Sequence, residues 1–297
     1  MPTYPPFEPE SGLRFTQEIH NDTYPAIDPS PSDCRGKAVY ITGASKGIGL
    51  ALALAYATAG ASQIGLGARS LSATIQDEVI DAAKKAGHTA PQVLKNKLDV
   101  TDSNSVAEAA RLAEKEFGRL DILVNNAGYL EEFAPLCDGD EKEYWRTWEI
   151  NIRGVYWMSK AMIPLLSKGG EMTIINISSI GAQNLSRGAS GYQTTKFALL
   201  RFTEFLNVDY GNEGLLAYSV HPGGIPTDLA KGMPSNAFSA LLVDTVELAS
   251  NTIVFLTKEK REWLAGRYVS CTWDMPEFIS RKKEIVNDDK LKMRMVW

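Results

Sequence analysis

The amino-acid sequence predicts an α/β protein in which helices flank a parallel central sheet. From about residue 37, short apolar runs alternate with amphipathic stretches. That alternation is typical of parallel strands joined by helical, right-handed crossovers, and it produces a doubly wound sheet. The first apolar run also leads through a glycine-rich loop directly into the first helical stretch. No second unit and no internal repeat is visible, so we expect a single domain.

The first elements follow from residue type and spacing. Residues 37–43 (KAVYITG) form a buried strand, and residues 49–60 form a helix that ends at a glycine. A second strand is expected at 62–68 and an amphipathic helix, again closed by glycine, at 72–87. The third strand lies at 92–100.

The later elements continue the same alternation. They are, in order, a helix at 105–118, a strand at 121–128, one long helix at 141–166, a strand at 171–179, a helix that contains Tyr192, a strand at 215–223, a helix near 243–257 and a strand at 266–273.

The ends of the chain differ from this pattern. Residues 1–35 hold seven of the 14 prolines and show no periodicity, so we expect an extended arm. This arm is either a disordered leader or a segment that packs on the body or on a neighbouring subunit. The domain then covers 36–275, and residues 276–297 form a charged helical tail, either flexible or docked on a subunit or over the pocket.

Composition excludes several classes of protein. The chain is 44% hydrophobic and 23% charged, as in ordinary globular proteins, and its net charge of -5 offers no basic surface for nucleic acid. No apolar run is long enough for a membrane span, and no secretory signal is visible, so we expect a cytoplasmic protein. The three cysteines and three histidines are scattered, so we expect no metal site.

A glycine loop between the first strand and the first helix predicts a dinucleotide site. Gly43, Gly47 and Gly49 allow a tight turn and a close approach of backbone to ligand. The helix N-terminus beyond them offers N–H groups to a pyrophosphate. The spacing is G-x-x-x-G-x-G, not the general G-x-G-x-x-G. Ser45 and Ile48 of the same loop are expected to contact the cofactor.

Two cations favour NADP over NAD. Where an acid at the end of the second strand would bind the ribose hydroxyls of NAD, this chain has Arg69. Lys46, inside the glycine loop, adds a second positive charge. We therefore predict NADP(H) as the preferred cofactor, with NAD(H) as the alternative.

Two tyrosine–lysine pairs have a spacing that places both side chains on one helix face. They are Tyr192 with Lys196 and Tyr156 with Lys160. Such a pair arises easily by chance, so its neighbours in the sequence must decide which one is functional.

The ordered motifs resemble those of the short-chain dehydrogenase/reductase family, from residue 37 to about 273. They are the Thr42–Gly49 loop, Asp99 in LDV, the NNAG segment Asn125–Gly128, Asn151, Ser179, Tyr192, Lys196 and the PGGIPT segment Pro222–Thr227. In this family the catalytic serine ends the fifth strand and the tyrosine begins the next helix. The resemblance therefore assigns the chemistry to Tyr192 and Lys196, and it favours Ser179 over the adjacent Ser178.

The resemblance implies a Rossmann-type fold and hydride transfer between a nicotinamide and a carbonyl, with proton transfer by Tyr192. A free tyrosine has a pKa near 10, and a nearby lysine cation favours the phenolate. Ser179 is expected to hydrogen-bond the substrate oxygen, and Lys196 also to bind the nicotinamide ribose. Asn151 is expected to hold a water that returns the proton.

The resemblance further implies the cofactor contacts. Asp99 would bind the adenine amino group, and Ile225 and Thr227 would fix the carboxamide. Asn125 and Gly128 either leave room for the cofactor or only support the sheet. The other expected cofactor residues are Val100, Asn126, Pro222 and Gly223.

The variable segments 129–138, 183–189 and 227–242 predict the substrate class. Their few charges, beside the apolar residues Leu130, Phe133, Leu185, Met233, Phe238 and Leu241, favour a lipophilic ketone or secondary alcohol, unless these residues are simply core. A less specific resemblance, to fungal reductases of secondary metabolism, implies a natural-product substrate.

Two other functions remain as alternatives, and the chain is expected to form an oligomer. The alternatives are a redox-neutral isomerase or epimerase that recycles its cofactor, and a cofactor-binding regulator without turnover. The long helix 141–166 is aromatic and apolar over much of its circumference, and family members pair through it and the Tyr192 helix. We expect a homodimer or homotetramer.

Overall fold

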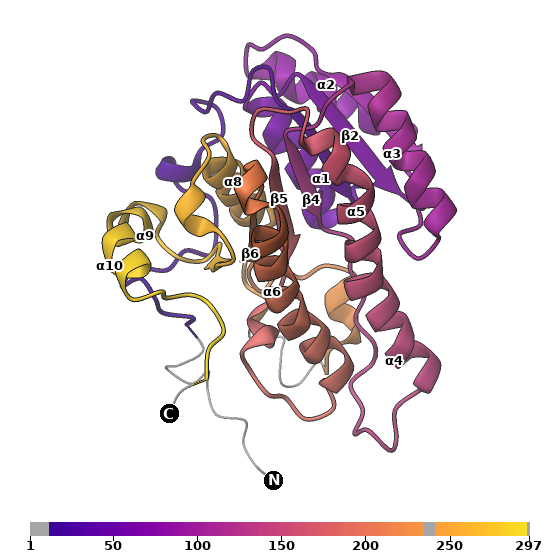
Figure 1. The fold of residues 1–297 in the computed structure, drawn as a ribbon, viewed down its shortest axis with the longest axis vertical. Helices are drawn as coiled ribbons and strands as arrows, with labels where there is room; N and C mark the ends of the chain where they lie inside the picture. Colours follow the sequence, from indigo (N-terminus) through magenta and orange to yellow (C-terminus); the bar gives the residue numbers. More distant parts are fainter. Residues whose placement is uncertain (1–11, 235–240, 296–297) are drawn as a thin grey trace.

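Seven parallel strands form the central sheet of the computed structural model, which describes residues 12–234 and 241–295 (Figure 1). Their order is β3-β2-β1-β4-β5-β6-β7, and every neighbouring pair is parallel. The strands are β1 (Ala38–Thr42), β2 (Gln63–Ala68), β3 (Gln92–Lys97), β4 (Ile122–Asn125), β5 (Thr173–Ile177), β6 (Leu216–His221) and β7 (Tyr268–Ser270). The doubly wound fold predicted from the sequence is confirmed.

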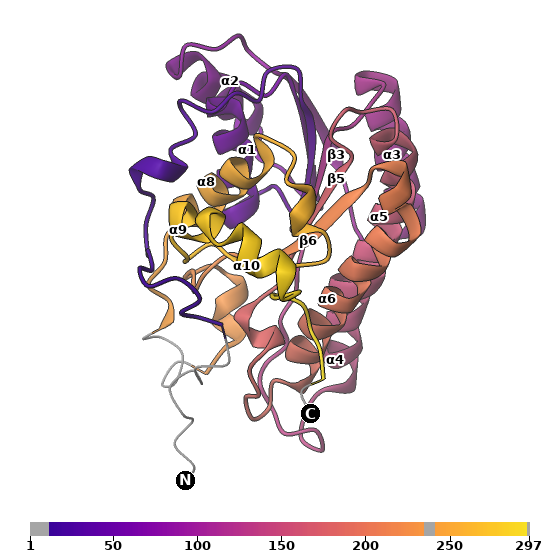
Figure 2. The same ribbon diagram turned by 60° about the vertical axis from the view of Figure 1, so that its left-hand side comes forward.

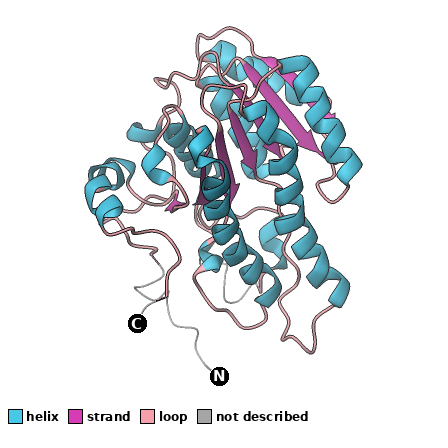
Figure 3. Ribbon diagram, viewed as in Figure 1, coloured by secondary structure: helices cyan, strands magenta, loops and turns pink. Residues whose placement is uncertain are grey.

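Helices cover both faces of the sheet (Figures 2 and 3). One face carries α1 (Gly47–Thr58), α2 (Ile75–Lys85) and α8 (Val246–Thr257). The other carries α3 (Ser103–Phe117), α4 (Glu141–Trp148), α5 (Val155–Leu166) and α6 (Ser190–Tyr210). Short helical turns connect them: η2 (Pro25–Ile27), η4 (Ile180–Ala182), η5 (Gly211–Glu213), η6 (Leu229–Gly232) and η8 (Glu262–Leu264). Among the described residues, no helix is both long and apolar enough to span a bilayer.

Alternate residues of each strand enter the two cores. Val39 and Ile41 of β1 pack toward α1, whereas Tyr40 lies in the other core. The glycines of β2 make room for the Tyr40 ring, because a Cβ on Gly65 would lie 2.3 Å from it. Strands buried on both faces are apolar almost throughout, which explains the continuous apolar runs in the sequence.

The helix expected at 141–166 is helical over that whole range but is not one regular α-helix. A wider π-helical segment, η3 (Glu149–Gly154), lies between α4 and α5, and Asn151 is in its middle. Other boundaries differ by a few residues: β4 ends at Asn125, because residues 126–128 leave the sheet to border the cavity described below.

Both described ends of the chain pack on the body. Ile19 forms an antiparallel bridge with Trp273, next to β7, and Ile27 is buried in the core beside α1 and α8. In the tail, α9 (Met275–Ser280) and α10 (Lys282–Asn287) bury Phe278 and Ile285 in the same core. The tail residue Trp297 lies outside the described residues.

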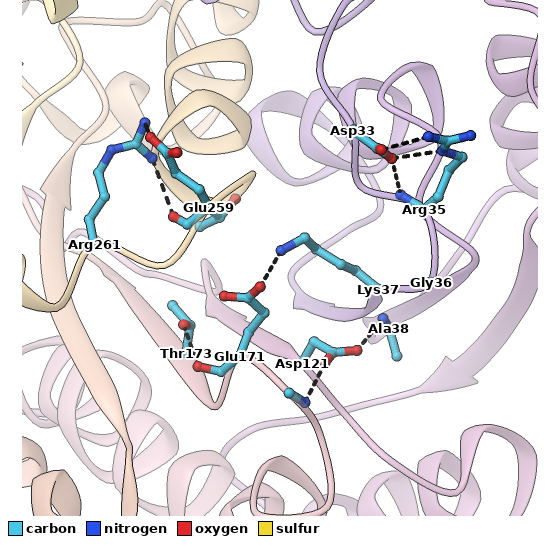
Figure 4. A network of polar contacts seen from close by, with 12 residues as sticks. Asp33, Arg35, Gly36, Lys37, Ala38, Asp121, Glu171, Thr173, Glu259 and Arg261 are labelled. Atoms are coloured by element: carbon cyan, nitrogen blue, oxygen red, sulfur yellow. Dashed lines mark hydrogen bonds and ion pairs between the residues drawn. The ribbon is translucent and has the colours of Figure 1, made fainter.

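A polar network joins the strands at their amino ends (Figure 4). Lys37 forms an ion pair of 2.6 Å with Glu171. The buried carboxylate of Asp121 accepts hydrogen bonds from the backbone N–H groups of Ala38 and Gly170, each at 2.8 Å. These contacts hold together the amino ends of the strands, opposite to the candidate site.

Candidate active site

A cavity of about 1090 Å³ opens at the carboxyl ends of the strands. Its walls come from the segments that follow β1, β2, β3, β4, β5 and β6. Strands β2 and β3 are added on one side of β1, and β4 to β7 are added on its other side. Ligands of doubly wound sheets bind at such a switch point in strand order, here between β1 and β4. Every residue predicted to bind the cofactor lines this cavity, together with Ser179.

The glycine loop makes a tight turn at positions where a side chain would not fit. Gly43 and Gly47 have positive φ angles of 67° and 56°, which side-chain-bearing residues rarely adopt. A Cβ on Gly49 would lie 2.3 Å from the carbonyl oxygen of Gly43. The side chain of the N-cap residue, Lys46, does not cap α1, and the first turn of the helix holds no acid, so its N–H groups suit an anionic ligand.

Two polar residues shape the part of the cavity that lies beyond β3 and β4. Asn126 ties the end of β4 to the glycine loop by donating to the carbonyl oxygens of Thr42 at 2.8 Å and Gly43 at 3.2 Å. Asp99 accepts two hydrogen bonds from Thr101. Burial raises the pKa of Asp99, but these hydrogen bonds outweigh it and hold the pKa below its usual value, so the carboxylate is charged.

Tyr192 and Lys196 lie together in the wall of the cavity, on the first turns of α6. Their exposed fractions are 7% and 4%. The Nζ of Lys196 lies 5.5 Å from the centre of the Tyr192 ring and donates to the carbonyl oxygen of Ile177 at 2.8 Å. Burial lowers the pKa of Lys196 to about 8. Burial raises the pKa of Tyr192 to about 12, although a hydrogen bond with Ser179 opposes this rise.

The two adjacent serines have different partners. Ser178 donates to the backbone carbonyl of Lys196 at 3.2 Å and is buried. Ser179 accepts from the N–H of Gly181 at 3.0 Å and faces the Tyr192 hydroxyl. Only Ser179 therefore has its hydroxyl beside the phenol.

Asn151 is close to this group but does not line the cavity. Its amide hydrogens go to the carbonyl oxygen of Tyr129 at 2.9 Å and to the hydroxyl of Thr195 at 3.0 Å. Its side-chain oxygen accepts from the Tyr129 N–H at 2.8 Å. Since its donors are used, the side chain holds the segment after β4 against α6 and has no hydrogen left for the expected water.

The second tyrosine–lysine pair lies on the outer surface of α5. Tyr156 is 45% exposed, and Lys160 Nζ lies 5.9 Å from its ring. Neither residue lines the cavity, so the structure separates the two pairs that spacing alone could not.

Glu131 is a polar neighbour of Tyr192 that the sequence did not point to. Its carboxylate is 6% exposed and accepts from the Tyr192 N–H at 2.8 Å and from the Thr147 hydroxyl at 2.5 Å. Its charge also raises the pKa of Tyr192. The sole sequence signal was an acid in the variable segment after the NNAG motif.

The predicted phosphate-binding cations are placed differently. Arg69 is exposed at the rim of the cavity, beyond β2. Lys46 forms an ion pair with Asp228, at the start of the segment that leads into η6. Asp228 also pairs with Lys231 at 2.5 Å, and these cations hold the pKa of its carboxyl near 2.

Part of the predicted substrate surface faces the cavity. Phe133, Met233 and Leu241 line it. Leu185 is 96% exposed and lies outside it, and Leu130 is buried in the protein instead. Phe238 lies outside the described residues.

Known proteins resemble this chain in sequence and in fold. Residues 37–237 match the family model described as short chain dehydrogenase. The short chain dehydrogenase mpl6 of Monascus purpureus is 52% identical over 290 residues, 98% of this chain and 99% of that protein. The short chain dehydrogenase pigC of Monascus ruber is 46% identical, over 95% of this chain and 94% of its own.

Solved structures extend the likeness to the fold. A short-chain type dehydrogenase/reductase from Mycobacterium marinum has a TM-score of 0.69 and 28% identity, over 83% of this chain and 97% of that chain. Carveol dehydrogenase from Mycobacterium avium, in complex with NAD, has a TM-score of 0.70 at 20% identity, over 80% of this chain and 97% of that chain.

Proposed function

The chain belongs to the short-chain dehydrogenase/reductase family of NAD(P)-dependent enzymes, and from this premise we propose that it interconverts a ketone and a secondary alcohol, with NADP(H) as preferred cofactor. The observation that carries the proposal is that Ser179 and the buried pair Tyr192 and Lys196 line the same cavity as the glycine loop at the N-terminus of α1.

In this proposal the three side chains divide the proton transfer among them. Tyr192 donates its proton to the carbonyl oxygen during reduction and accepts it back during oxidation. Lys196, with a pKa near 8, is mainly cationic at pH 7 and stabilises the phenolate that remains. Ser179 donates to the substrate oxygen and holds it beside the phenol. The bound cofactor would supply or accept the hydride and, when oxidised, a further positive charge.

Charge at the cavity rim supports the preference for NADP. Arg69 follows β2, where an acid would favour NAD, and it is free in space to meet a ribose phosphate at the rim. Lys46 can reach the same phosphate only by leaving Asp228. Arg69 is therefore the main contact to the phosphate in this proposal.

The apolar lining supports a lipophilic substrate. Phe133, Met233 and Leu241 line the same cavity as Tyr192, and they favour a carbonyl compound with a large apolar part. The similarity to short chain dehydrogenases of Monascus is consistent with a fungal natural product as that compound.

An exposed apolar surface supports pairing of two chains. Tyr156 of α5 and Phe197, Phe205 and Val208 of α6 are between 45% and 71% exposed, and α5 and α6 lie side by side (Figure 1). We call these four residues the α5–α6 face. Aromatic and aliphatic side chains grouped in this way are typical of protein interfaces.

The test is NADPH oxidation with a panel of lipophilic ketones, followed at 340 nm. Replacing Tyr192→Phe removes the acid and is expected to lower kcat by between about 10² and 10⁴. Tyr156→Phe is the matched control, because the same hydroxyl is lost outside the cavity, and we expect turnover within about twofold of wild type.

Three outcomes would count against the proposal. Equal losses in both variants would remove the role of Tyr192. Conversion of substrate without net NADPH oxidation would indicate a redox-neutral reaction. NADPH binding with no turnover of any ketone or alcohol would indicate a regulator.

A further inference from the structure

We propose that residues 12–23 of the amino-terminal arm form a fixed wall at the substrate end of the cavity. Through Leu13 and Ile19 this wall selects lipophilic substrates. We call residues 12–23 the arm. The proposal rests on the proposed function and adds a specificity element to it. The arm precedes the family match, which begins at residue 37, so it lies outside the part of the chain that carries the family's motifs.

The arm borders the same cavity as the catalytic group. Leu13, Ile19 and Asn21 line it, together with Tyr192 and Ser179. Leu13 and Ile19 are each only partly exposed.

The position of the arm places it at the substrate end. It pairs with Trp273 beyond β7, at one edge of the sheet. Arg69 and Asp99, the residues expected near the adenosine part of the cofactor, follow β2 and β3 at the opposite edge. The arm therefore lies on the side away from the predicted adenosine site.

A hydrogen-bonded link and a close approach connect the arm to the segments that surround the reacting centre. Asn21 donates to the carboxylate of Asp244 at 2.6 Å, and Asp244 accepts from the N–H of Gly224 at 2.5 Å. Asp244 thus links the arm to the PGGIPT segment. At the other end of the arm, a Cβ on Gly12 would lie 3.4 Å from the side chain of Gln183, in the segment after Ser179.

Backbone hydrogen bonds hold the arm on both sides of its pocket-lining residues. The indole of Trp273 donates to the Gly12 carbonyl at 3.0 Å, immediately before Leu13. The N–H of His20 donates to Thr272 at 2.7 Å, immediately after Ile19. The N–H of Thr245 donates to Asn21 at 2.9 Å. Anchored in this way, the two aliphatic side chains form a preorganised wall, which lowers the entropy cost of binding an apolar ligand.

The experiment compares Leu13→Ala and Ile19→Ala with Arg14→Ala in the full-length protein. Arg14 is the matched control, because it is exposed, lies in the same arm and does not line the cavity. The substrates are 2-decanone, which carries a long apolar chain, and 2-butanone, which does not. The KM and kcat for each ketone and the Kd for NADPH are measured, and thermal unfolding verifies that each variant is folded.

We expect the KM for 2-decanone to rise about tenfold in Leu13→Ala and Ile19→Ala, since a lost apolar contact in a pocket costs about this factor. The KM for 2-butanone and the Kd for NADPH should stay within about twofold of wild type in all variants. Arg14→Ala should match wild type throughout. Equal losses for both ketones, weaker NADPH binding or unchanged KM values would overturn the proposal.

The outcome remains decisive if wild type oxidises no NADPH with either ketone. The same result across the whole ketone and alcohol panel would refute the proposed function, whereas calorimetric binding of 2-decanone to the NADPH complex still tests the arm. Weaker binding in Leu13→Ala and Ile19→Ala, but not in Arg14→Ala, supports the wall. Equal binding in all proteins, or no binding to wild type, contradicts it.

Discussion

Lys196 is a buried cation in a site that disfavours its charge. Burial lowers its pKa from 10.5 to about 8, and within the described part of the chain its Nζ donates to one carbonyl oxygen, that of Ile177. Below pH 8 the folded protein carries the full cost of burying this charge. A site chosen for stability alone would hold an apolar side chain, so the lysine reflects function.

Lys196→Met should abolish turnover and stabilise the protein. At pH 7 we expect the free energy of unfolding to rise by roughly 2 kcal/mol, after the lost hydrogen bond is subtracted. Between pH 8 and about 10 the unfolded chain binds a proton that folded Lys196 has lost, so wild-type stability rises and the difference shrinks. The raised pKa of Tyr192 affects stability only above pH 10.

Urea unfolding of both proteins between pH 7 and pH 10 measures this difference. Lys160→Met, at an exposed position of α5, is the control and should show no such pH dependence. A constant difference between wild type and Lys196→Met across this range would contradict the assignment of a buried charge.

Arg69→Ala tests the cofactor preference at the residue scale. Loss of a charge-assisted contact to the ribose phosphate should raise the KM for NADPH about tenfold and leave the KM for NADH within about twofold. Lys46→Ala should have a smaller effect, because Asp228 already occupies its ammonium group. Equal increases for both cofactors would show that Arg69 does not discriminate between them.

At the scale of elements, the N-terminus of α6 is the structure that positions Tyr192. No side chain at its N-cap residue, Ala189, satisfies the first free N–H groups. Glu131, which lies in the loop after β4, accepts one of these N–H groups, that of Tyr192. The hydroxyl of Thr147 in α4 donates to the same carboxylate. Three segments therefore converge on one buried acid.

Glu131→Gln should keep an acceptor for the Tyr192 N–H and remove the negative charge. Because that charge raises the pKa of Tyr192, the pH at which alcohol oxidation reaches half its maximum should move lower. Stability should fall by about 1 kcal/mol, since a charge-assisted hydrogen bond becomes a neutral one.

The measurement is kcat for alcohol oxidation against pH, together with urea unfolding. Glu132→Gln, at the adjacent exposed acid, is the control and should leave the profile unchanged. A profile that moves to higher pH in Glu131→Gln would contradict the electrostatic account.

At the scale of the whole molecule, the amino ends and the carboxyl ends of the strands have different roles. The amino ends are joined by the ion pair of Lys37 with Glu171 and by the buried carboxylate of Asp121 (Figure 4). The carboxyl ends border the cavity. A parallel sheet separates these tasks because the loops after its strands all emerge on one side.

The α5–α6 face gives a prediction about assembly. Phe205→Glu and Val208→Glu should convert the proposed dimer to a monomer, because each places a charge at the centre of an apolar contact. Light scattering after size-exclusion chromatography measures the mass. Val286→Glu, on α10, is the control and should leave the assembly unchanged. Equal masses for wild type and the Phe205 variant would exclude pairing through this surface.

Local periodicity and chain direction were enough to predict the layers of the fold and to bring the expected cofactor residues to one cavity. Apolar alternation predicts parallel strands, and parallel strands bring their following loops to one edge, so Gly43, Asp99, Ser179 and Pro222 had to meet there. Helical spacing likewise placed Tyr192 beside Lys196. Each of these inferences uses only local periodicity and chain direction.

Contacts between elements that are distant in sequence could be read only from the folded chain. The π-helical turn orients Asn151 toward Tyr129 and away from the cavity, although local sequence predicted a regular helix. Glu131 reaches α6, and Asn21 reaches Asp244, across long stretches of chain. Periodicity encodes the environment of a residue within its own element, whereas these contacts depend on how separate elements pack together.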